Sequence, residues 1–161
     1  MGREDLDVFF YPKSVAVIGA SRTPGKVGYE LLKNLKEKYR GKIYPINPKA
    51  DEILGLKAYP SIKDVPDEID MAVISVPAAM VPKVAEECGE KGVKGLVVIS
   101  GGFREVGHEG AKLEEELVRV VRKYGMRLIG PNCVGVYVPK TGVNTVFLTK
   151  ERQGYPCLLY T

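Results

Sequence analysis

The sequence predicts a doubly wound α/β fold: one domain with a mainly parallel sheet and helices on both faces. Short β-branched runs alternate with longer stretches of helical period. The runs are apolar throughout instead of alternating with polar residues, as expected for strands covered on both faces. Strands that alternate with helices indicate right-handed crossovers between parallel neighbours. The predicted strands are Ser14–Ile18, Lys42–Ile46, Met71–Val76, Gly95–Ile99 and Met126–Ile129.

The predicted helices each place their apolar residues on one face. The last of them has acidic residues early, basic residues late and Gly125 just after it, which is the usual order of helix start and stop signals. Gly92 is the expected residue just past the end of the middle helix. The three helices are Val27–Tyr39, Met80–Lys91 and Glu109–Tyr124, and Tyr59–Pro66 is expected to hold one short helical turn.

Length and composition are those of one globular domain. The chain has 161 residues, of which 45% are hydrophobic and 27% charged, and it is too short for two full α/β domains. The net charge of +4 suits a small polyanionic ligand and predicts no nucleic-acid partner. No apolar run approaches the ~20 residues of a membrane span, and the acidic start is not that of a signal peptide. We therefore expect a cytoplasmic protein with no membrane association.

The polar composition carries two further expectations. The three cysteines, Cys88, Cys133 and Cys157, are widely spaced. They form neither a metal-binding pattern nor a disulfide framework, which indicates a reducing compartment and predicts no metal site. The chain has 24 basic and 20 acidic residues but one Gln and four Asn, a balance typical of a thermophile.

The loop after the first predicted strand is the first candidate binding segment. Ligands of such sheets bind beyond the carboxyl ends of the strands. The loop Gly19–Gly28 contains three glycines and the cations Arg22 and Lys26. Glycines let the backbone approach a phosphate, and the helix start offers free N–H groups. We interpret the loop as a pyrophosphate cradle in preference to a plain tight turn, although its Gly-x5-Gly-x2-Gly spacing is not the dinucleotide fingerprint.

The end of the second strand carries a different signal. NAD enzymes usually have an acidic residue here, which accepts a hydrogen bond from the ribose. This chain has Asn47 and Lys49 instead, which argues against NAD. The ammonium group of Lys49 favours an extra phosphate, as in NADP or the 3′-phosphate of coenzyme A. The alternative is a solvated surface lysine.

The ends of the other strands are less specific. Val76-Pro77 stops a strand and starts a helix, a structural role by default. Ser100-Gly101-Gly102 is either a nest of backbone donors or a flexible turn. No histidine lies near Cys133 in sequence, so a structural cysteine is favoured over a nucleophile. His108 is the chain's one histidine, and its place in a polar loop predicts a solvated side chain. We expect no catalytic residue.

Two motifs resemble a known family. Phe10-Tyr11-Pro12-Lys13-Ser14-Val15-Ala16-Val17-Ile18-Gly19-Ala20-Ser21 resembles the opening of the ADP-forming branch of the nucleoside-diphosphate-forming acyl-CoA synthetases. Gly130-Pro131-Asn132-Cys133-x-Gly135 is shared with the succinyl-CoA synthetase α subunit as well. The resemblance runs from about Phe9 to Gln153. It implies a Rossmann-like CoA-binding domain over residues 1–153, followed by an atypical tail over 154–161.

The resemblance also implies coenzyme A as the cofactor and a set of binding residues. In succinyl-CoA synthetase, coenzyme A contacts the loop after the first strand, a lysine after the second and backbone after the fourth, and a Val-Pro lines the same cleft. The Gly130–Cys133 loop is expected near the thiol end. The implied binding residues are Gly19, Ala20, Ser21, Gly25, Lys26, Gly28, Lys49, Val76, Pro77, Ile99, Ser100, Gly101, Pro131 and Asn132.

The activity of the family is implied only in part. Its enzymes convert acyl-CoA, phosphate and a nucleoside diphosphate into acid, coenzyme A and a triphosphate through a phosphohistidine in another domain. His108 does not match that histidine, so we expect binding of coenzyme A or acyl-CoA without turnover. The implied partners are the remaining synthetase domains or a nucleotide-binding β subunit, with a homo-oligomer as an alternative.

Two other functions stay open from the sequence. One is a stand-alone CoA-binding regulatory protein. The other is an NADP-binding oxidoreductase fragment. The spacing of the Gly19–Gly28 loop argues against the oxidoreductase, as does the lack of a Tyr-x3-Lys or other hydride-transfer arrangement.

Overall fold

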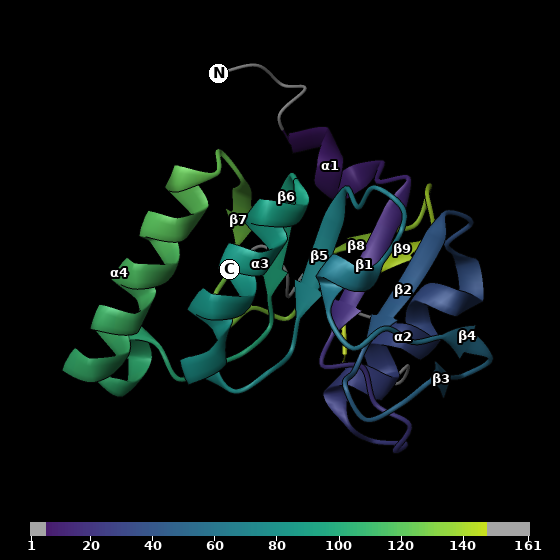
Figure 1. The fold of residues 1–161 in the computed structure, drawn as a ribbon, viewed down its shortest axis with the longest axis horizontal. Coiled ribbons are helices and arrows are strands. Elements are labelled where there is room, and N and C mark those ends of the chain that lie inside the picture. The colour runs from purple at the N-terminus through teal and green to yellow at the C-terminus, as the bar shows by residue number, and fades with distance from the viewer. Residues whose placement is uncertain (1–5, 148–161) are drawn as a thin grey trace.

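A five-stranded parallel sheet forms the centre of the protein (Figure 1). The computed structural model describes residues 6–147. All neighbouring strands of this sheet run parallel, and their order, β2-β1-β5-β6-β7, is that of a doubly wound sheet. The predicted fold class is therefore confirmed. The strands are β1 (Ser14–Ile18), β2 (Lys42–Ile46), β5 (Met71–Ile74), β6 (Gly95–Val98) and β7 (Arg127–Ile129).

Helices cover both faces of the sheet, as the apolar runs predict. On one face, Val15 and Val17 of β1 share a core with the leucines of α2. On the other face, Ala16 and Ile18 share a core with α3 and α4. Because successive side chains of a strand point to opposite faces, every residue of β1 is buried. The helices are α2 (Val27–Lys38), α3 (Val81–Lys91) and α4 (His108–Lys123).

Each predicted strand and helix is present: β1 and β2 have the predicted bounds, and the other boundaries differ by at most two residues. β5 ends at Ile74 instead of Val76, and β6 ends at Val98 instead of Ile99. The first residue after each strand still donates to its neighbour, from Ser75 N–H to Ile18 O at 2.9 Å and from Ile99 N–H to Ile74 O at 2.9 Å. The chain turns away only after these bonds. The predicted helical turn is the 3-10 helix η2 (Ile62–Asp64).

Several short elements were not predicted. Two-residue strands contain too few side chains to show a period, so their hairpins leave no pattern in the sequence. The second hairpin packs on the α2 side of the sheet, where the Asn34 side chain donates to Val146 O at 2.6 Å. The short elements are α1 (Asp7–Phe10), β3 (Glu52–Ile53), β4 (Leu56–Lys57), β8 (Tyr137–Val138), β9 (Val143–Asn144), η3 (Ala78–Met80) and η4 (Arg104–Val106).

Three predictions from composition concern the cysteines, metal sites and membrane-spanning helices. Cys88 and Cys133 are both free thiols. Residues 6–147 contain no group of three or more His, Cys, Asp or Glu side chains placed to hold a metal ion. No helix in the same range has the length and apolar character needed to span a membrane. The predicted tail over 154–161, with Cys157, lies outside the described residues.

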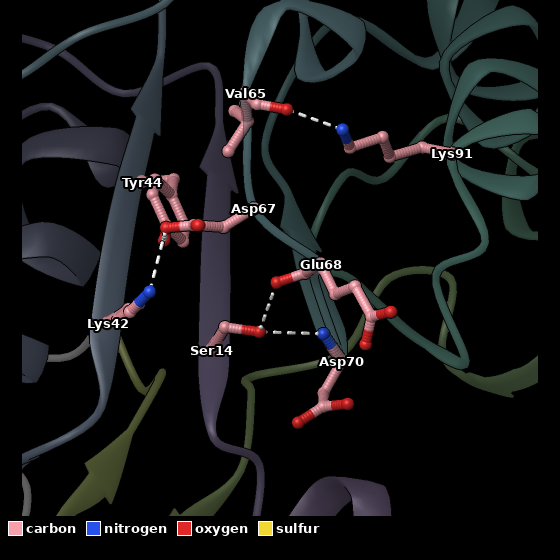
Figure 2. A network of polar contacts seen from close by, with 8 residues as sticks. All are labelled: Ser14, Lys42, Tyr44, Val65, Asp67, Glu68, Asp70 and Lys91. Carbon is pink, nitrogen blue, oxygen red and sulfur yellow. Dashed lines mark hydrogen bonds and ion pairs between the residues drawn. The ribbon is translucent and has the colours of Figure 1, made fainter.

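A polar network fixes the connection between η2 and β5 to the sheet (Figure 2). The hydroxyl of Ser14 donates to Glu68 O at 2.9 Å and accepts from Asp70 N–H at 2.9 Å. Burial alone would raise the pKa of the Asp70 carboxyl. Hydrogen bonds from the Lys94 ammonium and the Lys13 N–H, both at 2.8 Å, outweigh that effect and lower the pKa. Asp70 therefore stays ionised and joins β1 to β6.

The same connection is also held from β2 and from α3 (Figure 2). The buried Tyr44 hydroxyl donates to the Asp67 carboxylate, which Lys42 Nζ approaches at 2.9 Å. These two contacts lower the pKa of Asp67, while burial and the carboxylate raise the pKa of Tyr44. From α3, the Lys91 ammonium donates to Val65 O. The segment that carries η2 is thus anchored to three elements, and η2 forms one wall of the site described next.

Candidate functional site

The loop after β1 is shaped by glycines at a close approach between strand and helix. A Cβ on Gly28 would lie 2.0 Å from Gly19 O, so only glycine lets the first turn of α2 rest on the end of β1. Gly19 and Gly25 have φ values of +87° and +81°, in the left-handed region that favours glycine. Lys26 precedes α2 in an extended conformation, and no side chain caps the helix there. The start of α2 therefore keeps free N–H groups for an anion.

The loop after β2 is tied to the loop after β1. The Asn47 amide nitrogen donates to Ala20 O at 2.8 Å, and its oxygen accepts from Lys49 N–H at 2.8 Å. The Arg22 guanidinium reaches Lys49 O at 3.4 Å. These contacts place Lys49 beside the glycine-rich loop, although 20 residues separate it from Gly28, the last residue of that loop.

A cleft of about 450 Å³ opens where β1, β2 and β5 end. This is the crevice at which a doubly wound sheet binds ligands, because the strand order reverses there. Three ammonium groups line it, from Lys26, Lys49 and Lys83, with one carboxylate, from Glu87. The rest of the lining is mostly small or apolar: Ile18, Gly19, Ala20, Ser21, Ile46, Asn47, Pro48, Pro60, Ser61, Ile62, Val76, Pro77, Met80 and Val84.

The predicted binding residues fall into two adjacent groups. Those that line the cleft are Gly19, Ala20, Ser21, Lys26, Lys49, Val76 and Pro77. Gly25 and Gly28 shape the same loop without lining the cleft. Ile99, Ser100, Gly101, Pro131 and Asn132 lie at the ends of β6 and β7, outside this lining.

Contacts at the ends of β5, β6 and β7 connect the second group to the cleft. Asn132 N–H donates to Ser100 O at 2.9 Å, and a Cβ on Gly101 would lie 3.1 Å from the Asn132 side-chain oxygen. The Ser100 hydroxyl donates to Val76 O at 2.5 Å. Because Val76 lines the cleft, the second group continues the first along the carboxyl edge of the sheet.

The lining of the cleft includes neither Cys133 nor His108. The Cys133 thiol donates to Val98 O at 3.2 Å, and burial raises its pKa. A raised pKa disfavours the thiolate, which is the nucleophilic form. His108 is exposed at the start of α4.

Sequence reasoning missed the wall that α3 and η2 contribute. The cleft is lined from α3 and the turn before it by Met80, Lys83, Val84 and Glu87. Their spacing of three, four and seven residues marks one helix face. That face is distinct from the one that buries Val81, Ala85 and Cys88. The spacing was visible in the sequence, but the facing segment, Pro60–Ile62, was not.

Fold and site together are those of the class of α/β domains that bind phosphate-bearing nucleotide cofactors. The defining features are a doubly wound sheet, an uncapped helix start after a glycine-rich loop, and a lysine-lined cleft between them. The sequence pattern of the CoA binding domain family matches residues 13–139. The chain belongs to this family, which confirms the resemblance identified from its two motifs.

Similar proteins add a second line of support. Acetate–CoA ligase [ADP-forming] II subunit alpha of Pyrococcus furiosus is 52% identical over 149 residues, covering 92% of this chain and 33% of that protein. The crystal structure of PH0766 from Pyrococcus horikoshii OT3 has a TM-score of 0.87 and 56% identity, covering 89% of this chain and 33% of that one.

A third similar protein has been solved with ligands. It is the dinucleotide forming acetyl-coenzyme A synthetase 1 of Ca. Korarchaeum cryptofilum, in complex with phosphate and ADP. Its TM-score is 0.84 at 51% identity, and the match covers 88% of this chain and 30% of that one. The chain therefore spans about a third of the length of each of these three proteins.

Proposed function

We propose that this chain binds coenzyme A in the cleft beyond β1, β2 and β5, as the CoA-binding part of an ADP-forming acyl-CoA synthetase. The observation that carries the proposal is the joining of two phosphate-binding segments in one cleft by Asn47. The glycine-rich loop and Lys49 would each suit one phosphate group alone. Together they suit a ligand that carries a diphosphate and a separate phosphate on its ribose. Coenzyme A is such a ligand.

The binding mode follows from the chemistry of each segment. The diphosphate lies against the Gly19–Gly28 loop and the start of α2, where backbone N–H groups and Lys26 meet it. The 3′-phosphate pairs with Lys49. The pantetheine arm runs past Val76 toward Ser100 and Asn132, where the backbone turns between strands. The thiol end would then lie near the Gly130–Cys133 loop.

The proposed reaction belongs to the complete enzyme, in which acyl-CoA, ADP and phosphate give acid, coenzyme A and ATP. The relatives named above as a ligase and a synthetase favour this function over a stand-alone regulator or an NADP-dependent oxidoreductase. We assign this chain the binding of coenzyme A or acyl-CoA and no phosphoryl transfer of its own, because His108 lies apart from the cleft on α4. The remaining synthetase domains or a nucleotide-binding β subunit are the proposed partners.

The test is a calorimetric titration of the purified chain with coenzyme A, with NAD and NADP as controls. Phosphate contacts with charged and backbone donors should give micromolar affinity for coenzyme A, about −8 kcal/mol. NAD should show no binding, because Asn47 stands where NAD enzymes carry a carboxylate. A circular dichroism melt on the same sample checks the fold. A folded chain that fails to bind coenzyme A would contradict the proposal.

A further inference from the structure

Among the described residues, Glu87 is the one carboxylate that lines the cleft, and the other charged residues of the lining are lysines. A negative charge there repels the phosphates of a polyanionic ligand. In the described part of the chain no ion pair within 4.0 Å involves Glu87, even though Lys83 stands one turn earlier on the same helix face. The charge of Glu87 raises the pKa of Lys63, but the ammonium of Lys63 is paired with Glu90. The hydrogen bond that it accepts from the Ser61 hydroxyl is long, at 3.4 Å, so the carboxylate of Glu87 keeps acceptor capacity for a donor of the ligand.

The position of Glu87 is set from both sides of the cleft. It lies on α3, and the facing hydroxyl of Ser61 donates to its Oε2 at 3.4 Å, the long end of the hydrogen-bond range. Ser61 is itself held as the N-cap of η2, where its Oγ accepts from Lys63 N–H at 3.2 Å and its N–H donates to Asp64 at 3.0 Å. The polar network of Figure 2 anchors the same segment to β1, β2 and α3. Carboxylate and hydroxyl thus form a fixed pair.

This pair lies at the β2 end of the cleft. Ser61 follows β2 and Lys49, and the backbone of neighbouring Tyr59 bonds to Asn47 and Pro45. The pantetheine arm leaves in the opposite direction, toward β6 and β7. In coenzyme A the 3′-phosphate sits on the ribose that carries the base, so a 3′-phosphate at Lys49 brings the base into this end. Apolar side chains of Ile46, Ile62 and Val84 line it and suit the faces of a purine.

We infer that Glu87 and Ser61 recognise the amino edge of the adenine base. This inference rests on the proposed binding of coenzyme A. The Glu87 carboxylate accepts a hydrogen bond from the exocyclic N6 amino group. The Ser61 hydroxyl turns from its long bond with Glu87 to donate to the neighbouring ring nitrogen N1. The pair is therefore a specificity element for adenine, in which the N6 amino group replaces the long Ser61 bond as the donor to the carboxylate.

The probe is 1,N6-etheno-coenzyme A, in which a two-carbon bridge ties N1 to N6. The bridge removes the N6 hydrogens and blocks N1, and it leaves all phosphates and the pantetheine arm unchanged. Wild-type protein should bind coenzyme A more tightly than the etheno compound by roughly tenfold to a hundredfold, the range for a hydrogen bond to a charged group. Glu87→Ala should weaken coenzyme A and bind both ligands within about threefold of each other.

Two further variants separate recognition from other effects. Glu87→Gln keeps the size of the side chain and removes its charge, so it should reduce the preference for coenzyme A over the etheno compound. An undiminished preference in this variant would mean that the protein discriminates by the bulk of the bridge and not by hydrogen bonding. That result would overturn the inference. Glu115→Ala removes the same charge from an exposed site on α4 and should keep the wild-type preference.

The outcomes distinguish this inference from the proposed function. Equal binding of coenzyme A and the etheno compound by wild-type protein would overturn the role of Glu87 and Ser61 but leave coenzyme A binding standing. A preference that survives in Glu87→Ala would overturn it as well. Absence of coenzyme A binding by folded wild-type protein would overturn the proposed function and this inference with it.

Discussion

The side-chain amide of Asn47 donates a hydrogen bond of 2.8 Å to the carbonyl oxygen of Ala20. This bond joins the loops that follow β1 and β2, the two segments with the phosphate-binding character. The same side chain accepts from Lys49 N–H, so one residue fixes both the spacing of the loops and the backbone from which the Lys49 ammonium extends. An aspartate here could keep only the second bond.

Asn47→Asp should therefore weaken coenzyme A binding more than Asn47→Ala. The aspartate oxygen would face Ala20 O without a hydrogen to donate, and its charge would repel the phosphates. We expect a loss of roughly tenfold or more for Asn47→Asp, in line with the ~1.5–3 kcal/mol of a charged hydrogen bond. Titration calorimetry of both variants is the measurement. Wild-type affinity in Asn47→Asp would show that the Asn47–Ala20 bond does not organise the site.

Lys49→Ala should weaken coenzyme A far more than dephospho-coenzyme A. The ammonium is assigned to the 3′-phosphate, which only the first ligand has, so roughly a tenfold loss is expected for coenzyme A and little change for the other. Lys33→Ala, which removes an exposed lysine from α2, controls for the change in net charge. Parallel losses for the two ligands in Lys49→Ala would remove the 3′-phosphate assignment.

Gly28→Ala should destabilise the fold more than Gly25→Ala. A Cβ at Gly28 meets Gly19 O at 2.0 Å, whereas one at Gly25 meets nothing within 4 Å. Gly25→Ala should cost only the left-handed backbone penalty of about 1–2 kcal/mol. Thermal unfolding of the two variants gives the comparison, and similar melting temperatures would contradict the close packing of α2 on β1. The affinity of Gly28→Ala for coenzyme A is therefore compared with that of wild-type protein only for the folded fraction of the variant.

Asp70 should make the stability of the protein depend on acid pH. Its pKa is lowered in the folded state from a usual value of 3.8, so its stabilising contribution is complete above that value. The contribution is lost as the pH falls below 3.8 through the lower folded-state pKa. Asp70→Asn should cost about 1–3 kcal/mol near neutral pH, for the partly unpaired Lys13 and Lys94 donors.

The measurement is urea unfolding of wild-type and Asp70→Asn protein between about pH 7 and about pH 2. The difference in unfolding free energy between the two should shrink as Asp70 becomes protonated. A difference that stays constant over this range would mean that the ionised carboxylate contributes nothing beyond its hydrogen-bonding shape.

Much of the fold could be predicted from the sequence because burial on two faces leaves a strong local pattern. The five apolar runs and the three amphipathic segments are the strands of the sheet and the helices that cover it, with boundaries that differ from the predicted ones by at most two residues. The boundaries differ because a strand ends where its last neighbour bond is made, as at Ser75 and Ile99, and that depends on the partner strand. The β3–β4 and β8–β9 hairpins could not be predicted from the sequence, because two-residue strands are too short to show a hydrophobic period.

The candidate site likewise combines local features of the sequence with contacts between distant segments. The sequence by itself determined which segments can meet phosphate, because glycine spacing, a helix start and a lysine after a strand are local features. Only the tertiary structure decided that Ser61 faces Glu87 across the cleft, 26 residues apart in the chain. Such a pairing arises from long-range packing of η2 against α3, held by contacts from β1 and β2, and no local pattern encodes it.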